Sequence, residues 1–345
     1  MVATIWTLAL LVFGLSEGLL AWDVRFAYLP AAEQVLDGDS PYPALNDPIL
    51  EEQKGYVYPP QLVLLLVPLT ALPIDVVALL VGLGLLALVV ATLYVLGVRD
   101  VAVYAASFLW MPTASGVLLA NVSIPLAFAT ALLWVYRDRL WPGAAALGLA
   151  VSAKLVLWPL LVWTAVTGRV RLTVRALAVA AALTLSAWAV IGFAGLSGYP
   201  DLLRRLDEIQ AANSYSFVGM AATLGLGETF GRAVALLVGG ALLASCVVLA
   251  RRGEEFRAFT CAVAATLALS PIVWLHYLFV LIVPLAIARP RFSPIWLLPV
   301  LLWISPRPGY AEGFKTFLPA IAAAILVGFV LVAPRRDGER GTAPA

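Results

Sequence analysis

A succession of long apolar runs is the feature that most limits what this chain can fold into. Of its 345 residues, 63% are hydrophobic and only 12% are charged, whereas an ordinary soluble domain is about 45–50% apolar and about 25% charged. A soluble fold could not bury so much apolar surface, so the lipid bilayer must be its solvent. Because lipid offers the backbone no hydrogen-bond partner, the apolar runs are predicted to be helices.

The apolar runs number about a dozen, and several are too short to cross a bilayer alone. They cover approximately residues 3–21, 61–72, 75–96, 101–119, 122–135, 140–153, 155–166, 174–193, 230–249, 259–269, 272–287, 294–304 and 317–332. We predict an all-α polytopic membrane protein, a bundle of about 10–13 transmembrane or partly inserted helices. A single transmembrane domain would occupy residues 1–334, followed by a disordered cytoplasmic tail over residues 335–345. The first run has no basic region before it and no small-residue cleavage site after it, so we interpret it as a retained span.

The positions of the arginines orient these segments, because cytoplasmic loops are enriched in basic residues. Placing the basic groups inside orients the chain from Arg137 onward and puts residues 195–228 outside. Residues 22–58 are also placed outside, because the segment before the first run carries too little to be exported. The first of these outer loops carries seven carboxylates against two cations, Arg25 and Lys54, which suits an extracytoplasmic position. Two interpretations of residues 61–72 stay open: a crossing or a re-entrant segment. The basic groups are Arg137/Arg139, Arg169/Arg171/Arg175, Arg251/Arg252/Arg257, Arg289/Arg291 and Arg335/Arg336.

Charge, cysteines and motifs exclude several function classes. The net charge of +2 gives no indication of a nucleic-acid partner. Cys246 and Cys261 both lie in apolar sequence and are interpreted as buried small hydrophobes rather than a disulfide or a metal pair. No phosphate-binding loop, dinucleotide fingerprint, nucleophile elbow or zinc-protease motif occurs. No internal repeat is visible, which argues mildly against a transporter.

Asp23 is the first candidate for chemistry. It follows the first apolar run and has Trp22 before it. A carboxylate at a membrane boundary lies near water, while apolar neighbours raise its pKa toward the range of a general base. The alternative is an ordinary solvated carboxylate that ends a helix and pairs with Arg25. After it, residues 26–36 are predicted to form a short amphipathic helix along the membrane interface, and residues 56–60 supply aromatic side chains suited to the headgroup layer.

Three further polar residues interrupt apolar sequence on the same predicted face. Lys154 lies between two short apolar runs, where it either holds a phosphate or snorkels to the interface. His276, the only histidine, either binds a phosphate or sugar or is a satisfied structural residue. Asn121 either binds a sugar hydroxyl or caps a helix. One carboxylate, one lysine and one histidine on one face suit a reaction on a lipid-linked phosphate at the outer leaflet.

Taken in order, these residues resemble the polyprenol-phosphate-mannose-dependent mannosyltransferases of glycosyltransferase family 87. The likeness extends over most of the chain and has four short motifs in register. They are Asp23 with Tyr28, Ala31-Ala32, Gly38, Pro41-Tyr42 and Tyr58-Pro59-Pro60; Asn121 at a Gly-Gln-x-Asn-like turn; Ala153-Lys154 with Pro159; and Ser270-Pro271 with Trp274 and His276.

The resemblance implies a GT-C architecture, a multi-helix bundle whose active site faces the extracytoplasmic side of a bacterial cell membrane. It implies an inverting glycosyltransferase that moves a sugar, mannose foremost, from a polyprenyl-phosphate donor to a glycolipid or glycan acceptor among membrane lipids. No cofactor, metal or nucleic acid is expected. The site residues that it implies are Asp23 as general base, Lys154 and His276 on the donor phosphate, and Arg25, Tyr28, Tyr58 and Asn121 along the substrates. The alternative is a transporter or flippase of a lipid-linked sugar, which would use the same lysine and histidine.

Overall fold

The computed structural model describes residues 2–305 and 313–332, and this part of the chain is helical without a strand. Four helical segments in it are apolar and long enough to cross a bilayer: α4 (Ile74–Val95), α10 (Val170–Val190), α13 (Gly227–Arg251) and Gly313–Val332, which contains η9 (Gly313–Phe317) and α16 (Leu318–Val332). A fifth span is broken into α5 (Val101–Leu109) and α6 (Met111–Leu119), which meet at an angle of 63°.

Six shorter apolar helical segments complete the bundle. They are α1 (Val2–Ser16), α7 (Ser123–Tyr136), α8 (Leu140–Ala153), Leu155–Val166 with η4 (Leu155–Leu157) and α9 (Pro159–Val166), Leu275–Ala288 with η7 (Leu275–Leu281) and α15 (Ile282–Ala288), and η8 (Pro294–Ile304). The helix α14 (Glu255–Ala268) packs between α13 and α9 and is buried over most of its length. These segments confirm the predicted all-α, multi-pass membrane fold. The tail predicted over residues 335–345 lies outside the described residues.

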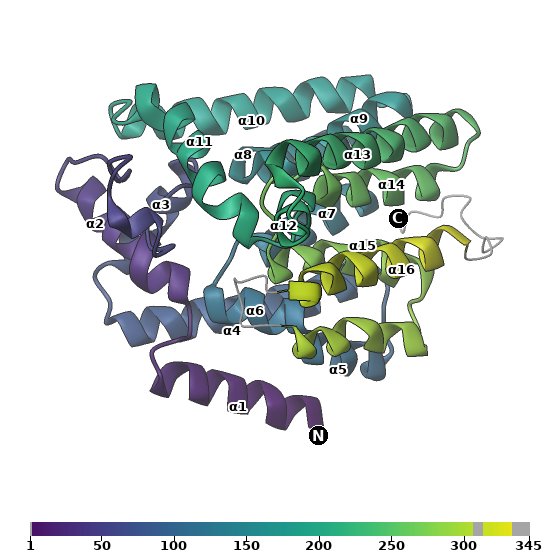
Figure 1. Cartoon of the computed structure of the whole chain (residues 1–345), viewed down its shortest axis with the longest axis horizontal. Helices are drawn as coiled ribbons and strands as arrows, with labels where there is room; N and C mark the ends of the chain where they lie inside the picture. Colours follow the sequence, from purple (N-terminus) through teal and green to yellow (C-terminus); the bar gives the residue numbers. More distant parts are fainter. Residues whose placement is uncertain (1, 306–312, 333–345) are drawn as a thin grey trace.

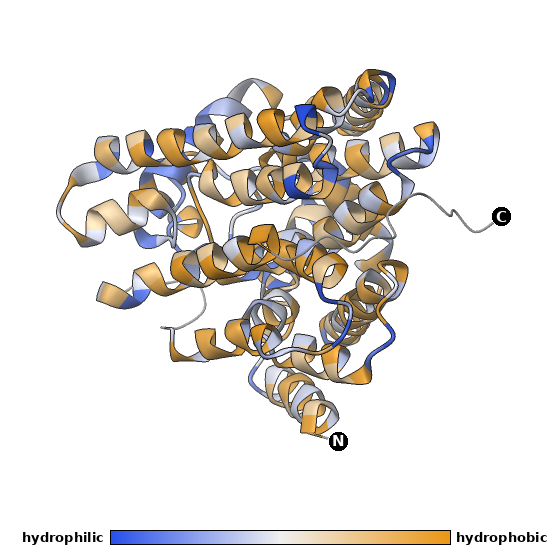
Figure 2. Cartoon of the chain, turned by 90° about the vertical axis from the view of Figure 1, so that its right-hand side faces the viewer, coloured by the Kyte–Doolittle hydropathy of each residue, from blue (hydrophilic) through white to orange (hydrophobic). Residues whose placement is uncertain are grey.

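Small residues let the helices approach closely, as in membrane bundles, where packing rather than the hydrophobic effect holds helices together. Gly143 and Gly148 of α8 face α10. An added Cβ at Gly148 would lie 2.7 Å from Cβ of Val179, and one at Gly143 would lie 2.7 Å from a methyl group of Leu172. Figure 2 shows hydrophobic residues along the helices, with the hydrophilic stretches mainly in the connecting loops.

One end of the bundle is fastened by an ion-pair network. Arg137, which follows α7, lies 3.0 Å from Glu255 at the start of α14. Arg169, just before α10, lies 2.9 Å from the same carboxylate and 2.6 Å from Asp138. The helices α7 and α8 run from this end toward Asn121 and Lys154, so these two residues lie at the opposite end of the bundle.

Elements from the two predicted outer loops assemble at that opposite end (Figure 1). The first loop contributes η1 (Val24–Tyr28), α2 (Leu29–Leu36) and η2 (Pro48–Leu50), and the apolar run after it forms α3 (Gln61–Leu66) and η3 (Val67–Leu69). The second loop contributes η5 (Leu196–Gly198), α11 (Tyr199–Gln210), η6 (Ala211–Asn213) and α12 (Phe217–Thr223). Two tyrosines connect the loops and brace the first one internally. Tyr199 donates to the carbonyl of Val57 at 3.0 Å, and Tyr42 donates to the carbonyl of Tyr58 at 3.1 Å.

The short segments between α1 and α4 show whether the amphipathic helix forms and whether residues 61–72 are long enough to cross a bilayer. The predicted amphipathic helix is present as η1 and α2; Ala31 and Ala32 are buried and Glu33 is exposed. The buried face of α2 packs on α3 and η3. Within residues 61–72, α3 has six residues and η3 has three, too few to span about 30 Å at about 1.5 Å per residue. This run is therefore too short to cross the bilayer as a helix.

Candidate functional site

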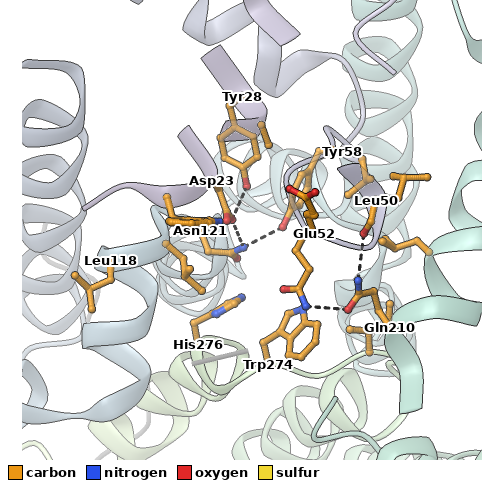
Figure 3. Close-up of a pocket in the computed structure, with 18 of the residues that line it drawn as sticks. Asp23, Tyr28, Leu50, Glu52, Tyr58, Leu118, Asn121, Gln210, Trp274 and His276 are labelled. Carbon is orange, nitrogen blue, oxygen red and sulfur yellow. Dashed lines mark hydrogen bonds between the residues drawn. The ribbon is translucent and has the colours of Figure 1, made fainter. Parts of the chain in front are cut away.

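A cavity of about 620 Å³ opens where the outer-loop elements meet the ends of the bundle helices. This volume lies within the range of small-molecule sites, about 300–1,000 Å³. Five of the residues singled out from the sequence line it: Asp23, Tyr28, Tyr58, Asn121 and His276. Figure 3 shows them converging from segments far apart in the sequence.

Asp23 is held through only one of its two carboxylate oxygens. The chain turns sharply after α1, with Ala21 in the left-handed region at a φ of 58°, and Asp23 is the residue directly before η1. Its Oδ2 accepts hydrogen bonds from the Tyr28 hydroxyl and from Nδ2 of Asn121, both at 3.1 Å. Among the described residues nothing donates to Oδ1. The carboxylate is therefore fixed in orientation while one oxygen is free to accept a proton.

Asn121 connects the carboxylate to the rest of the site. It follows Ala120, whose φ of 53° closes the end of α6. Its Oδ1 accepts from the backbone N–H and the hydroxyl of Ser123 at 3.2 and 3.0 Å. This pattern orients the amide, so that Nδ2 donates both to Asp23 and to the Tyr58 hydroxyl at 3.0 Å. Asn121 thus caps the start of α7 and holds the carboxylate at the same time.

Three tyrosine rings form the wall beside Asp23. Tyr28 packs edge-on against Tyr56 and Tyr58, with ring centroids 5.9 and 5.6 Å apart. The Tyr56 hydroxyl is used internally, since it donates to the carbonyl of Pro59 and accepts from the N–H of Val63. The hydroxyls of Tyr28 and Tyr58 instead belong to the network around Asp23. The wall is aromatic, and two of its three hydroxyls, those of Tyr28 and Tyr58, take part in the hydrogen bonds around the carboxylate.

Burial raises the pKa of Asp23 from its ordinary value of 3.8 to about 6. Hydrogen bonds from Asn121 and Tyr28 and the positive charge of Lys154 oppose this change in pKa to a smaller extent. A carboxylate with a pKa of about 6 is mostly ionised at neutral pH, yet it is basic enough to take a proton from a reacting hydroxyl. The environment therefore tunes Asp23 toward proton transfer.

Lys154 lies behind the cavity wall rather than on it. It follows α8, and its Nζ is buried without a hydrogen-bond partner among the described residues. The ammonium instead sits over two aromatic rings that line the cavity, 3.6 Å from the centroid of Tyr277 and 5.4 Å from that of Tyr58. A buried, unpaired ammonium is costly, so an anionic partner would stabilise the charged form of Lys154.

His276 lines the cavity and also has an unsatisfied nitrogen. The residue is 2% exposed, and no described residue binds its buried Nε2. Its Nδ1 lies 3.5 Å from the hydroxyl of Ser115. If this hydroxyl donates to Nδ1, the ring proton resides on Nε2, which makes His276 a donor toward the cavity. Buried polar atoms are normally paired, so Lys154 and His276 are the two candidates in this region for binding a ligand.

The structure does not bring Arg25 to the cavity. Its guanidinium pairs with Asp75 at the start of α4 at 2.5 Å and donates to the carbonyl of Leu20 at 2.7 Å. Arg25 thereby fastens η1 to the bundle, and this placement differs from the substrate-binding position implied by the resemblance.

The cavity is lined by further residues, of which Gln53 and Gln210 had no signal in the sequence. Gln53 and Gln210, from different outer loops, meet at 2.9 Å across the cavity wall. Trp22 and Trp274 add two large aromatic surfaces, although only Trp274 belonged to a recognised motif. Among residues 2–305 and 313–332, no three His, Cys, Asp or Glu side chains gather as a metal-binding group. Cys246 and Cys261 are free and buried, as predicted.

Comparison with known proteins gives one match. The family model of glycosyltransferase family 87 matches residues 56–273, well over half of the chain. The matched range contains Tyr58, Asn121 and Lys154, while Asp23 and His276 lie outside it. No curated protein and no solved structure matches the chain.

Proposed function

Because the chain belongs to glycosyltransferase family 87 and is a multi-pass membrane glycosyltransferase, we propose that it is an inverting enzyme of the GT-C type. It moves a sugar, mannose foremost, from a polyprenyl-phosphate donor to a glycolipid or glycan acceptor. The reaction takes place on the extracytoplasmic face of a bacterial cell membrane, with Asp23 as the general base.

One observation carries this proposal. A carboxylate held through a single oxygen lines a cavity whose surroundings contain two buried, unpaired nitrogens, Nε2 of His276 and Nζ of Lys154. Proton removal and phosphate binding need these two kinds of group side by side. The positive charge of Lys154 is close enough to Asp23 to lower its pKa, which supports binding of the donor phosphate and the acceptor hydroxyl in one cavity.

The reaction needs one base and a good leaving group. Oδ1 of Asp23 takes the proton of an acceptor hydroxyl while the hydroxyl oxygen attacks the anomeric carbon of the donor. The bond between that carbon and the phosphate oxygen breaks, and the electron pair leaves with the polyprenyl phosphate. Attack opposite the leaving group converts a β-linked donor into an α-glycoside. The general base contributes about 10²–10⁴-fold, and positioning of the two substrates supplies the remainder.

Lys154 and His276 stabilise the departing phosphate in this scheme. The ammonium supplies charge and Nε2 of His276 donates a hydrogen bond, so both groups stabilise the negative charge that grows on the phosphate. Since Tyr58 and Tyr277 now cover the ammonium, the phosphate reaches Lys154 once these rings shift.

The distribution of charge supports the extracytoplasmic side. The site lies at the end of the bundle away from Arg137 and Arg169, and such basic groups favour the cytoplasm. The end that carries the arginines favours an enzyme over the transporter alternative. There, Glu255 and Asp138 pair with Arg137 and Arg169 in a closed network. A transporter would need polar groups that lead through both leaflets.

A transfer assay with purified protein tests the proposal. Polyprenyl-phosphate mannose, glucose and galactose are compared with the corresponding nucleotide sugars, using a neutral alkyl glycoside as acceptor. We expect transfer from polyprenyl-phosphate mannose, an α-linked product, and loss of product in the Asp23→Asn variant. Transfer from nucleotide sugars alone, a retained anomeric configuration, or a fully active Asp23→Asn variant would each overturn the proposal.

A further inference from the structure

The cavity has a second polar group at the side formed by the outer loops. Nε2 of Gln53 donates to Oε1 of Gln210 at 2.9 Å, and Nε2 of Gln210 donates to the carbonyl of Leu50 at 3.3 Å. Figure 3 shows Gln210 and Trp274 on the far side of the cavity from Asp23 and Tyr28. The catalytic scheme above does not use Gln53, Gln210 or Trp274.

Gln53 occupies a strained backbone position. Its φ of 59° is in the left-handed region, where a residue with a Cβ costs about 1–2 kcal/mol and where glycine or asparagine is usual. The position closes the turn after η2, because the N–H groups of Gln53 and Lys54 return to the carbonyls of Leu50 and Ile49. Strain of this kind gathers at functional sites. A glutamine here suggests that its side chain is needed in the cavity.

The glutamine pair has unused hydrogen-bonding capacity. Among the described residues, nothing donates to Oε1 of Gln53. Each of the two amides also carries a second N–H that makes no hydrogen bond to them. The pair therefore presents both acceptors and donors to the cavity. A sugar hydroxyl both donates and accepts, so neutral amides match it without any charge.

The charge of the lining indicates what kind of acceptor fits. Of the residues that line the cavity, the charged ones are acidic, Asp23 and Glu52. Glu52 pairs with Lys54 at 2.9 Å, and the Lys54 ammonium lies over Trp22 and Phe26. The side lined by Gln53 and Gln210 thus offers no free cation to a phosphate. The indole of Trp274 in the same wall provides a flat apolar surface for the C–H face of a sugar ring.

We propose that Gln53, Gln210 and Trp274 form the acceptor subsite, and that it takes an uncharged sugar residue rather than a phosphorylated headgroup. This inference rests on the proposed function and names the substrate that Asp23 deprotonates. The sugar ring lies against Trp274, its outer hydroxyls bind the two amides, and its attacking hydroxyl reaches Oδ1 of Asp23.

The test separates acceptor binding from donor binding. Initial rates are measured with polyprenyl-phosphate mannose against a neutral octyl glycoside and against the same glycoside carrying a phosphate. Donor hydrolysis without acceptor is measured in parallel. The Gln53→Gly variant removes the amide and relieves the backbone strain, so it is expected to fold. Gln53→Asn keeps an amide and tolerates the left-handed turn. Phe193→Gly is the matched control, because Phe193 also has a positive φ, 58°, and does not line the cavity.

We expect Gln53→Gly to raise the KM for the neutral glycoside about tenfold, which corresponds to about 1.4 kcal/mol. Its donor KM and donor hydrolysis stay at the wild-type level, Gln53→Asn recovers part of the loss, and Phe193→Gly behaves as wild type. The phosphorylated glycoside is the poorer acceptor. An unchanged acceptor KM, a raised donor KM in Gln53→Gly, or a preference for the phosphorylated glycoside would overturn the inference.

Failure of the proposed function would look different. If the wild type uses no polyprenyl-phosphate sugar, the proposed donor is wrong, and the subsite is tested by calorimetric binding of the octyl glycoside. Tenfold weaker binding to Gln53→Gly than to wild type then supports the subsite, and equal binding refutes it.

Discussion

Replacing Asp23 with asparagine is expected to abolish activity and to make the protein more stable. Both hydrogen bonds to the carboxylate, from Tyr28 and Asn121, end on the same oxygen, Oδ2. The carbonyl oxygen of an asparagine can accept both of them, and its NH₂ group then takes the place of the free oxygen. The variant keeps the geometry and removes only the charge and the base.

The size of the stability effect follows from the pKa of Asp23. Burial raises this pKa from 3.8 to about 6, and each unit corresponds to about 1.4 kcal/mol, which gives about 3 kcal/mol. Since the folded-state pKa is the higher one, the folded protein binds the proton more tightly. The favourable contribution is therefore complete below pH 3.8 and is lost as the pH rises through about 6. At pH 8 the charged carboxylate costs the fold the whole amount, and asparagine avoids this cost.

Thermal unfolding in detergent, followed at several pH values, measures this difference. The Asp23→Asn variant should melt several degrees above the wild type at pH 8 and at nearly the same temperature at pH 4. Turnover should fall about 10²–10⁴-fold at pH 8. Asp75→Asn is the control, because this exposed carboxylate pairs with Arg25 outside the cavity. A variant that melts below the wild type at pH 8 would refute the burial argument, and one that keeps normal turnover would refute the role as base.

Three further predictions follow from the same site. The wild-type kcat/KM should rise about tenfold per pH unit up to about pH 6 and then level off, because Asp23 must lose its proton; a profile that stays flat from pH 4 to 8 would contradict this. Lys154→Met should raise the donor KM about 10- to 100-fold, the value of a charged hydrogen bond. It should also move the acid limb of the pH profile to higher pH, since the lysine lowers the pKa of Asp23; an unmoved limb would contradict this. Ala120→Gly should change the free energy of unfolding by less than about 1 kcal/mol, whereas Ala120→Val should destabilise by more, because a β-branched side chain suits the left-handed turn least; thermal melts of both variants decide.

The membrane fold could be predicted from the sequence because the relevant signal is local. Each apolar run carries its own evidence of insertion, and the basic groups order the runs. The exception was residues 61–72, whose apolar length did not decide between a membrane crossing and a re-entrant segment. The structure ends α3 at Leu66 and continues as η3 over Val67–Leu69. Pro68 explains the change, since proline lacks an N–H and disrupts a regular helix.

Which side chains meet in the cavity could be predicted only in part. Orientation placed Asp23, Asn121 and His276 on one face, and the structure brings these three to one cavity. Whether Arg25 also lines the cavity depended on the position of the start of α4, where Asp75 forms an ion pair with the guanidinium. The role of Gln53 could not be predicted from the sequence, because its partner lies 157 residues away and neither residue belongs to a sequence motif.

Two positions beside the site have alanine in a left-handed backbone conformation, where glycine is the usual residue. Of the non-glycine residues with positive φ in the described ranges, Ala21, Gln53 and Ala120 adjoin or line the cavity. Ala21 and Ala120 are 0% and 6% exposed, so each buries a methyl group worth about 0.8 kcal/mol. That gain roughly offsets the cost of the left-handed conformation, about 1–2 kcal/mol for a residue with a Cβ. A glycine would be similar in energy but freer to move, whereas alanine holds the turns that aim Asp23 and Asn121 at each other. We therefore expect the two methyl groups to contribute rigidity to the hydrogen-bonded pair of Asp23 and Asn121 rather than net stability.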